Sequence, residues 1–147
     1  DVAALPEEKR VHALDGGSVR HTRSLGDAVG LTTLGVHKVR LTQGCRSSVL
    51  HFHHHDEEWV YILSGQGVAE IGDEKHEVGP GDFMGFVAGS LPHNLFNPRA
   101  EDLVYLVGGN RLPCDVCDYP RIRMRRYRTN GVNEYVSLDA LQLRPQK

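Results

Sequence analysis

The sequence predicts an all-β fold in a single domain, and three observations support that class. From Ser18 onward, short alternating or β-branched runs are separated by turns rich in glycine, proline and aspartate. Only one short segment, close to the C-terminus, has a helical pattern. The chain has 147 residues, which is the length of one ordinary domain. Many short, evenly spaced strands in one domain are typical of a sandwich or barrel, and a jelly roll suits this length.

The predicted elements follow one another without an internal repeat. Residues 1–16 include Pro6 and have no clear period, so we expect an irregular N-terminal arm or a short edge segment. The expected strands are 33–42, 47–53, 58–64, 68–71, 76–78, 83–87, 92–96 and 103–107. Residues 72–75 form a good hairpin turn, and the Gly-Pro-Gly-Asp sequence at 79–82 forms a second tight turn. The core is therefore expected within about residues 30–110 of a single domain, 1–147.

The C-terminal part of the chain departs from this regular spacing. Gly108 to Pro120 interrupts the strand pattern, so we expect a long loop there before a final strand. Leu138 to Leu143 has a helical pattern, with Ser137 as the N-cap residue.

Composition and charge restrict the function. The chain is 39% hydrophobic and 24% charged, and its net charge of −2 disfavours a nucleic-acid or membrane partner. No apolar run approaches membrane-spanning length, and no segment resembles a signal peptide. The 3 cysteines are too few for a disulfide framework and favour a reducing, cytoplasmic location.

The segment from His51 to Leu63 contains the clearest chemical signal. His51 and His53 are two residues apart, so on a strand their side chains leave the same face. After a short turn, Glu58 can rejoin them on the neighbouring strand. Two imidazoles and a carboxylate are most of a metal site, and we expect His93 to complete it.

The spacing of these residues resembles the two signature motifs of the cupin superfamily. The first motif comprises Gly44, His51, His53, Glu58 and Gly65. The second comprises Gly81, Val87, Gly89, His93 and Asn97. Each motif has one extra residue before its first histidine, and Val87 stands where proline is usual. The resemblance implies a double-stranded β-helix barrel with His51, His53, Glu58 and His93 as metal ligands. The Cys-Asp-Tyr-Pro-Arg and Arg-Tyr-Arg segments are similar to those of small single-domain cupins, some labelled sugar-phosphate isomerases.

This ligand set indicates a function. Three imidazoles and one carboxylate suit one divalent Fe, Mn, Ni, Co, Cu or Zn ion, and the remaining net charge of about +1 favours an anionic chelating ligand. The sequence therefore predicts a metal-dependent isomerase, epimerase or lyase acting on a small oxygen-rich acid or sugar. An Fe-, Ni- or Cu-dependent dioxygenase is the alternative, and a non-catalytic metal- or sugar-binding module is a third hypothesis.

The remaining candidate residues have a structural and a functional interpretation. Glu57 competes with Glu58 as ligand, but the count to Gly65 favours Glu58. The proton shuttle is then expected to be Glu57 or a metal-bound hydroxide. Arg121, Arg123 and Arg125 either protect an edge strand or bind the anionic end of the substrate.

Several further residues are given structural interpretations. We interpret His54 and His55 as solvated turn residues or residues at the barrel mouth, and the Cys-x-x-Cys pair as structural. Asn97 is expected to form structural hydrogen bonds. Small cupins commonly pair through sheet edges, so a homodimer is expected.

Overall fold

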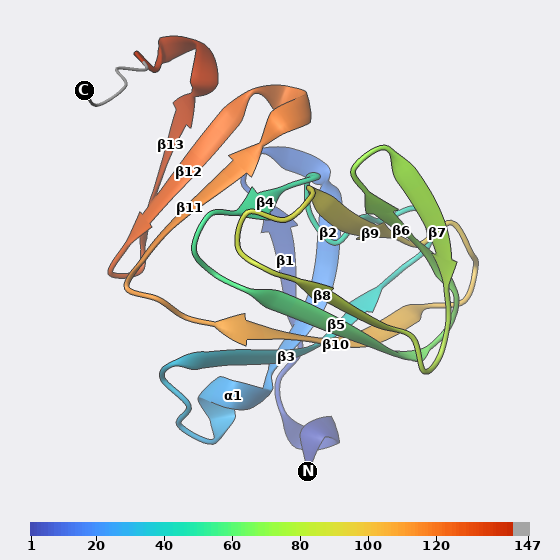
Figure 1. The fold of residues 1–147 in the computed structure, drawn as a ribbon. Helices are drawn as coiled ribbons and strands as arrows, with labels where there is room; N and C mark the ends of the chain where they lie inside the picture. The colour runs from blue at the N-terminus through green and yellow to red at the C-terminus, as the bar shows by residue number, and fades with distance from the viewer. Residues whose placement is uncertain (143–147) are drawn as a thin grey trace.

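The structure is a computed structural model that describes residues 1–142, and it contains three antiparallel sheets (Figure 1). The strands are β1 Glu8–His12, β2 Asp15–Ser24, β3 Leu34–Leu41, β4 Phe52–His53, β5 Glu58–Ser64, β6 Gly67–Ile71, β7 Glu74–Val78, β8 Phe83–Phe86, β9 His93–Phe96, β10 Leu103–Asn110, β11 Cys114–Tyr119, β12 Met124–Thr129 and β13 Val132–Ser137. The helices are α1 Leu25–Ala28 and short 3₁₀ turns at Val2–Ala4, Pro120–Ile122 and Leu138–Ala140. This content confirms the all-β prediction.

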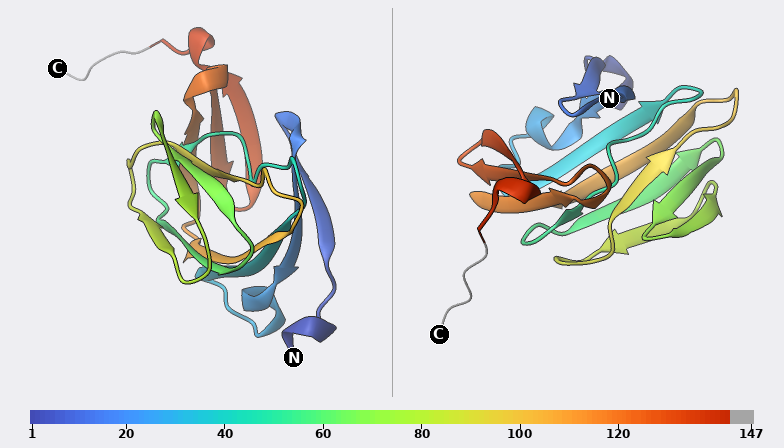
Figure 2. Two further views of the ribbon diagram at one scale, coloured as in Figure 1. Left: turned by 90° about the vertical axis from the view of Figure 1, so that its right-hand side faces the viewer. Right: turned by 90° about the horizontal axis from the view of Figure 1, so that it is seen from above.

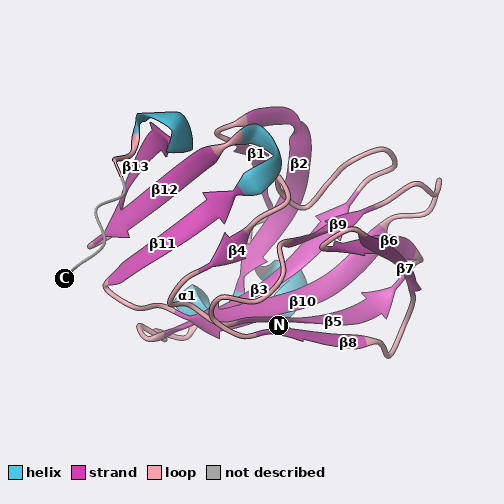
Figure 3. Ribbon diagram, turned by 45° about the horizontal axis from the view of Figure 1, so that its top comes forward, coloured by secondary structure: helices cyan, strands magenta, loops and turns pink. Residues whose placement is uncertain are grey.

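The sheets form a barrel with an additional sheet at one end. The largest sheet has the order β1-β2-β3-β10-β5-β8, and the three-stranded sheet β7-β6-β9 faces it (Figure 3). The third sheet, β13-β12-β11-β4, rises from one end of the barrel, as the orange and red strands of Figure 2 show. Strand β4 therefore connects the barrel to this third sheet.

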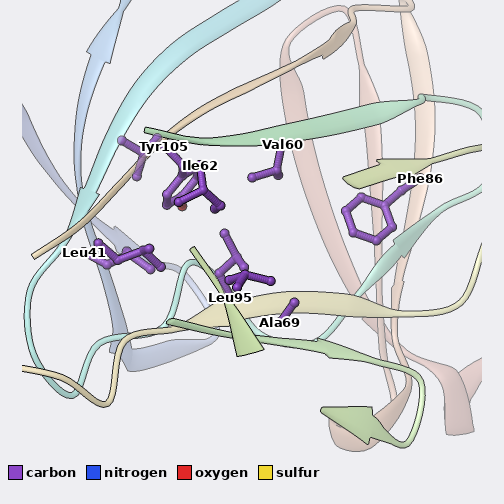
Figure 4. Packing of buried hydrophobic residues seen from close by; sticks show 10 residues of the cluster. Leu41, Val60, Ile62, Ala69, Phe86, Leu95 and Tyr105 are labelled. Carbon is purple, nitrogen blue, oxygen red and sulfur yellow. The ribbon is translucent and has the colours of Figure 1, made fainter. Parts of the chain in front are cut away.

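The apolar core lies between the two facing sheets. The residues of β5 alternate between a buried and an exposed face. Val60 and Ile62 are 5% and 0% exposed, whereas Leu63 is 38% exposed. Leu95 of β9 and Ala69 of β6 close the core from the opposite side (Figure 4). All the buried members of this cluster lie between residues 39 and 105, inside the predicted core range.

The structure selects one of the two alternatives at the N-terminus, and one prediction near the C-terminus was wrong. Residues 8–12 form an edge segment, β1, which pairs with β2 as a hairpin at the edge of the largest sheet. The expected loop over 108–120 instead contains the end of β10 and all of β11. Gly108 and Gly109 do not interrupt β10, because they lie where a Cβ atom would collide with the Trp59 ring and with the Glu57 carbonyl.

The predicted C-terminal helix is shorter than expected. It is a 3₁₀ turn at Leu138–Ala140, and the Ser137 hydroxyl accepts a hydrogen bond from the Asp139 amide at 3.2 Å, as predicted for an N-cap. The predicted end of the helix, Leu143, lies outside the described residues.

The core assignment makes a stability prediction. Ile62→Ala removes buried volume and should lower the free energy of unfolding by about 2–5 kcal/mol. Leu63→Ala, one residue away on the exposed side of the same strand, should change it by less than about 1 kcal/mol. Urea denaturation followed by circular dichroism measures both, and equal losses would show that the two faces are misassigned.

Candidate metal centre

Four predicted residues come together at one end of the barrel. Glu58 begins β5, His53 ends β4, and His93 begins β9. His51 lies just before β4 and forms an isolated bridge with His93, through a hydrogen bond from the His93 amide to the His51 carbonyl at 2.8 Å and a reciprocal bond at 3.2 Å. The main chain therefore fixes the two histidines opposite each other.

The three histidine Nε2 atoms lie around one oxygen atom of Glu58, and ligand atoms of His51, Glu58 and His93 all lie within 4.8 Å of one another. The Glu58 Oε2 atom lies 3.8 Å from His51 Nε2, 3.7 Å from His53 Nε2 and 3.4 Å from His93 Nε2. These separations are long for hydrogen bonds. They agree with the roughly 3.0–4.2 Å between atoms that share one ion at about 2.1 Å each.

The other ring nitrogen of each histidine is held by an acceptor. His51 Nδ1 lies 2.9 Å from the Val49 carbonyl, and His93 Nδ1 lies 3.3 Å from the Leu91 carbonyl. His53 Nδ1 lies 2.6 Å from Asp115 Oδ2. These acceptors require a proton on Nδ1. Each Nε2 therefore keeps a lone pair that can bind an ion beside Glu58. The donor set thus fits a metal ion.

Burial and charge prepare these groups for the same role. Burial lowers the pKa of His51, which keeps that ring neutral. Burial alone would raise the pKa of Glu58, but the imidazole groups of His51 and His93 beside it hold the pKa well below its usual value. The centre therefore combines neutral imidazole with an ionised carboxylate.

Asp115 supports the centre from the third sheet. Its side chain is fully buried, and its Oδ1 atom accepts from the amides of His55 and Asp56 at 3.3 and 3.2 Å. Burial opposes its ionisation, but the hydrogen bond from His53 and these further contacts bring its pKa to about 2. Asp115 is therefore a charged acceptor that orients the His53 ring.

The centre opens into a cavity of about 570 Å³, a size that suits a small molecule. Residues of every described strand except β6 and β7 line it. Its arginines are Arg10, Arg20, Arg111, Arg126 and Arg128. Glu57, which the sequence predicts as a proton shuttle, is exposed and also lines this cavity.

The arginines predicted to bind substrate lie elsewhere. Arg121 is 3.6 Å from Glu70, Arg123 pairs with Asp139, and Arg125 donates to Asp118 at 2.6 and 2.7 Å. None of the three lines the cavity. The 3₁₀ turn before β12 and the positive φ of 53° at Arg123 set the register of this strand, so the even-numbered arginines 126 and 128 face the centre instead.

Sequence reasoning also missed His12 and Arg20, which line the cavity from β1 and β2. For Arg20 the sequence contained a pattern that could have predicted this position. The alternation of residues 18, 20 and 22 has the period of a half-buried strand, although the first strand that was given bounds begins at residue 33.

The other singled-out residues lie outside the centre or have structural contacts. His54 Nε2 is 3.0 Å from Asp118, and His55 is exposed. The Asn97 side chain donates to the carbonyls of Leu41 and Glu101 at 2.9 Å each, which confirms its structural role.

Comparisons with known proteins agree with this geometry. A crystal structure of a candidate sugar phosphate isomerase from Acidithiobacillus ferrooxidans is 39% identical to this chain, with a TM-score of 0.95 over 99% of this chain and 93% of that one. The cupin domain family matches residues 37–109. The chain belongs to the cupin superfamily.

Two further proteins are similar to this cupin. A cupin-superfamily sugar phosphate isomerase from Silicibacter pomeroyi is 28% identical, with a TM-score of 0.86 over 98% of this chain and 95% of that one. An uncharacterized protein of Methanocaldococcus jannaschii is 33% identical over 73 residues, which are 50% of each chain. This cupin therefore spans about half the length of that curated relative. No helix within residues 1–142 is long and apolar enough to cross a membrane.

The cysteines of this cupin should differ in reactivity. Cys114 is exposed, whereas Cys117 is fully buried and burial raises its pKa to about 12. At pH 8 this lowers the thiolate fraction of Cys117 roughly a thousandfold relative to a free thiol. Maleimide labelling followed by mass spectrometry should modify Cys114 in the native protein and Cys117 only after unfolding. Early labelling of Cys117 would contradict its position.

Proposed function

We propose that His51, His53, Glu58 and His93 bind one divalent transition metal ion, and that this cupin is a metal-dependent enzyme acting on a small oxygen-rich acid or sugar. The observation that carries the proposal is the orientation of the three rings. Each Nδ1 faces an acceptor, and each Nε2 faces the same carboxylate oxygen at 3.4–3.8 Å. A purely structural cluster would not need this common orientation.

The chemistry of the four donors favours a transition metal. Imidazole suits Fe, Mn, Ni, Co, Cu and Zn, whereas Mg and Ca prefer sites made of oxygen atoms alone. The single carboxylate leaves a net charge of about +1 against a divalent cation, which favours an anionic chelating substrate. When bound, the ion supplies Lewis-acid polarisation of a substrate carbonyl.

The residues of the chain would bind the substrate and move its proton. The cavity accepts a molecule of small-metabolite size, so a small molecule is the proposed partner. Glu57 lies on its wall, and its amide donates to the Asn110 side chain at 2.8 Å, which fixes the main chain beside Glu58. This position suits proton transfer to or from a carbon next to the carbonyl.

An isomerase, epimerase or lyase reaction is favoured over oxidation. Proton transfer next to a polarised carbonyl needs only a Lewis acid and a carboxylate base. Two of the similar structures, from Acidithiobacillus ferrooxidans and Silicibacter pomeroyi, carry names of that non-redox class.

The ligand assignment predicts metal loss in one variant. His93→Ala removes one of four donors, and its metal content by elemental analysis should fall to less than about a tenth of the wild-type value. His55→Ala changes an exposed histidine, and Cys114→Ala changes an exposed cysteine. Both controls should keep full occupancy. Full occupancy in His93→Ala would overturn the assignment.

The reaction class predicts the dependence on oxygen. Turnover of keto acids and sugars by the metal-loaded protein should be the same in air and under anaerobic conditions, and no oxygen should be consumed. Activity that disappears without oxygen would instead identify a dioxygenase.

The proposed role of Glu57 makes a separate prediction. Glu57→Gln should lower kcat by about 10²-fold or more while metal content stays unchanged.

A further inference from the structure

Most of the arginines that line the cavity are already neutralised. Arg128 lies 2.6 Å from Asp56, Arg111 lies 2.5 Å from Asp27, and Arg10 lies 2.9 Å from Glu8. Arg20 and Arg126 differ from these three. Within residues 1–142 no carboxylate forms an ion pair with Arg20, and the one carboxylate paired with Arg126 is Asp115, at 3.5 Å.

Arg126 is a buried cation with unused hydrogen-bonding capacity. Its side chain is 18% exposed, and its nearest carboxylate atom is Asp115 Oδ2 at 3.5 Å. That oxygen already accepts the shorter bond from His53 at 2.6 Å. The Arg126 Nε atom is buried, and no described residue accepts its proton. A buried donor of this kind is costly unless a ligand or water satisfies it.

Arg20 faces the same cavity from β2. Its one hydrogen bond is a long contact of 3.4 Å to the Ser47 carbonyl, and no acidic side chain within residues 1–142 forms an ion pair with it. Thr22 is two residues further on and shares this face of the strand. The Thr22 hydroxyl is also buried without a partner.

His12 lines the same cavity as Arg20 and Arg126. Its Nδ1 atom accepts from the Leu14 amide at 3.2 Å, so the ring proton is on Nε2. Burial, together with the nearby His51 ring and the charges of Arg20 and Arg126, lowers its pKa to about 4. His12 therefore adds a neutral ring to a wall that both arginines and one proposed metal ligand, His51, also line.

We propose that Arg20 and Arg126, together with the Thr22 hydroxyl, bind the phosphate group of a phosphorylated substrate whose oxygen-rich end lies at the metal centre. This inference rests on the proposed function, because the oxygen-rich end of the same substrate is placed at the metal centre. Arg20 has no paired carboxylate and Arg126 shares Asp115 with His53, so a phosphate dianion complements the two guanidinium groups better than a carboxylate with one charge. The three terminal phosphate oxygens can also accept from several donors at once.

The test measures binding of inorganic phosphate to the metal-loaded protein by isothermal titration calorimetry. Arg20→Gln and Arg126→Gln should each weaken phosphate binding at least about tenfold. Arg121→Gln is the matched control, because Arg121 is exposed and lies outside the cavity. It should bind phosphate like the wild type. Acetate should bind the wild type at least tenfold more weakly than phosphate.

Unchanged phosphate binding in the two cavity variants, or acetate binding equal to that of phosphate, would overturn the proposal. Because Arg126 is buried, its variant is checked by circular dichroism, and Arg20→Gln decides the question if Arg126→Gln does not fold. Elemental analysis of the same samples separates the two proposals. Wild-type protein without metal would contradict the proposed function, whereas phosphate binding that still depends on Arg20 would uphold the anion site.

Discussion

The orientation of three imidazole rings is the constraint on which the site depends. His51, His53 and His93 come from different segments, and each ring is fixed by an acceptor at Nδ1. The isolated bridge between His51 and His93 holds the main chain as well as the rings. Because the Nδ1 hydrogen bond fixes the orientation of each ring, the Nε2 atoms converge on Glu58. This convergence does not depend on flexible loops.

This constraint couples the metal centre to the cavity wall. Asp115 Oδ2 is 2.6 Å from His53 and 3.5 Å from Arg126, so one buried carboxylate contacts a proposed ligand and a proposed anion-binding residue. Removing either partner would leave charge in a poorly solvated place. The small third sheet, which rises from the end of the barrel in Figure 1, therefore belongs to the site and is not a peripheral addition.

Local patterns predicted part of this arrangement correctly. The β5 limits were predicted exactly as the structure has them, since the alternation of Val60 and Ile62 with exposed residues defines both the strand and its buried face. The prediction failed at Gly108 and Gly109, where glycine marks close approach of Trp59 and Glu57 and not a turn. For the region of β1 it left an irregular arm and an edge segment as alternatives, because the pairing partner of an edge strand is not visible in its own sequence.

The sequence by itself determined the fold class and the superfamily resemblance, and it named four residues that the structure places at one end of the barrel. Those features depend on local periodicity and short spacings, which a linear pattern contains. Only the tertiary structure decided which arginines reach the cavity, since one left-handed residue at position 123 and the register of β12 against β11 select residues 126 and 128. It likewise decided that His12 and Arg20 face the site, because β2 must first pair with β3 to become part of the wall.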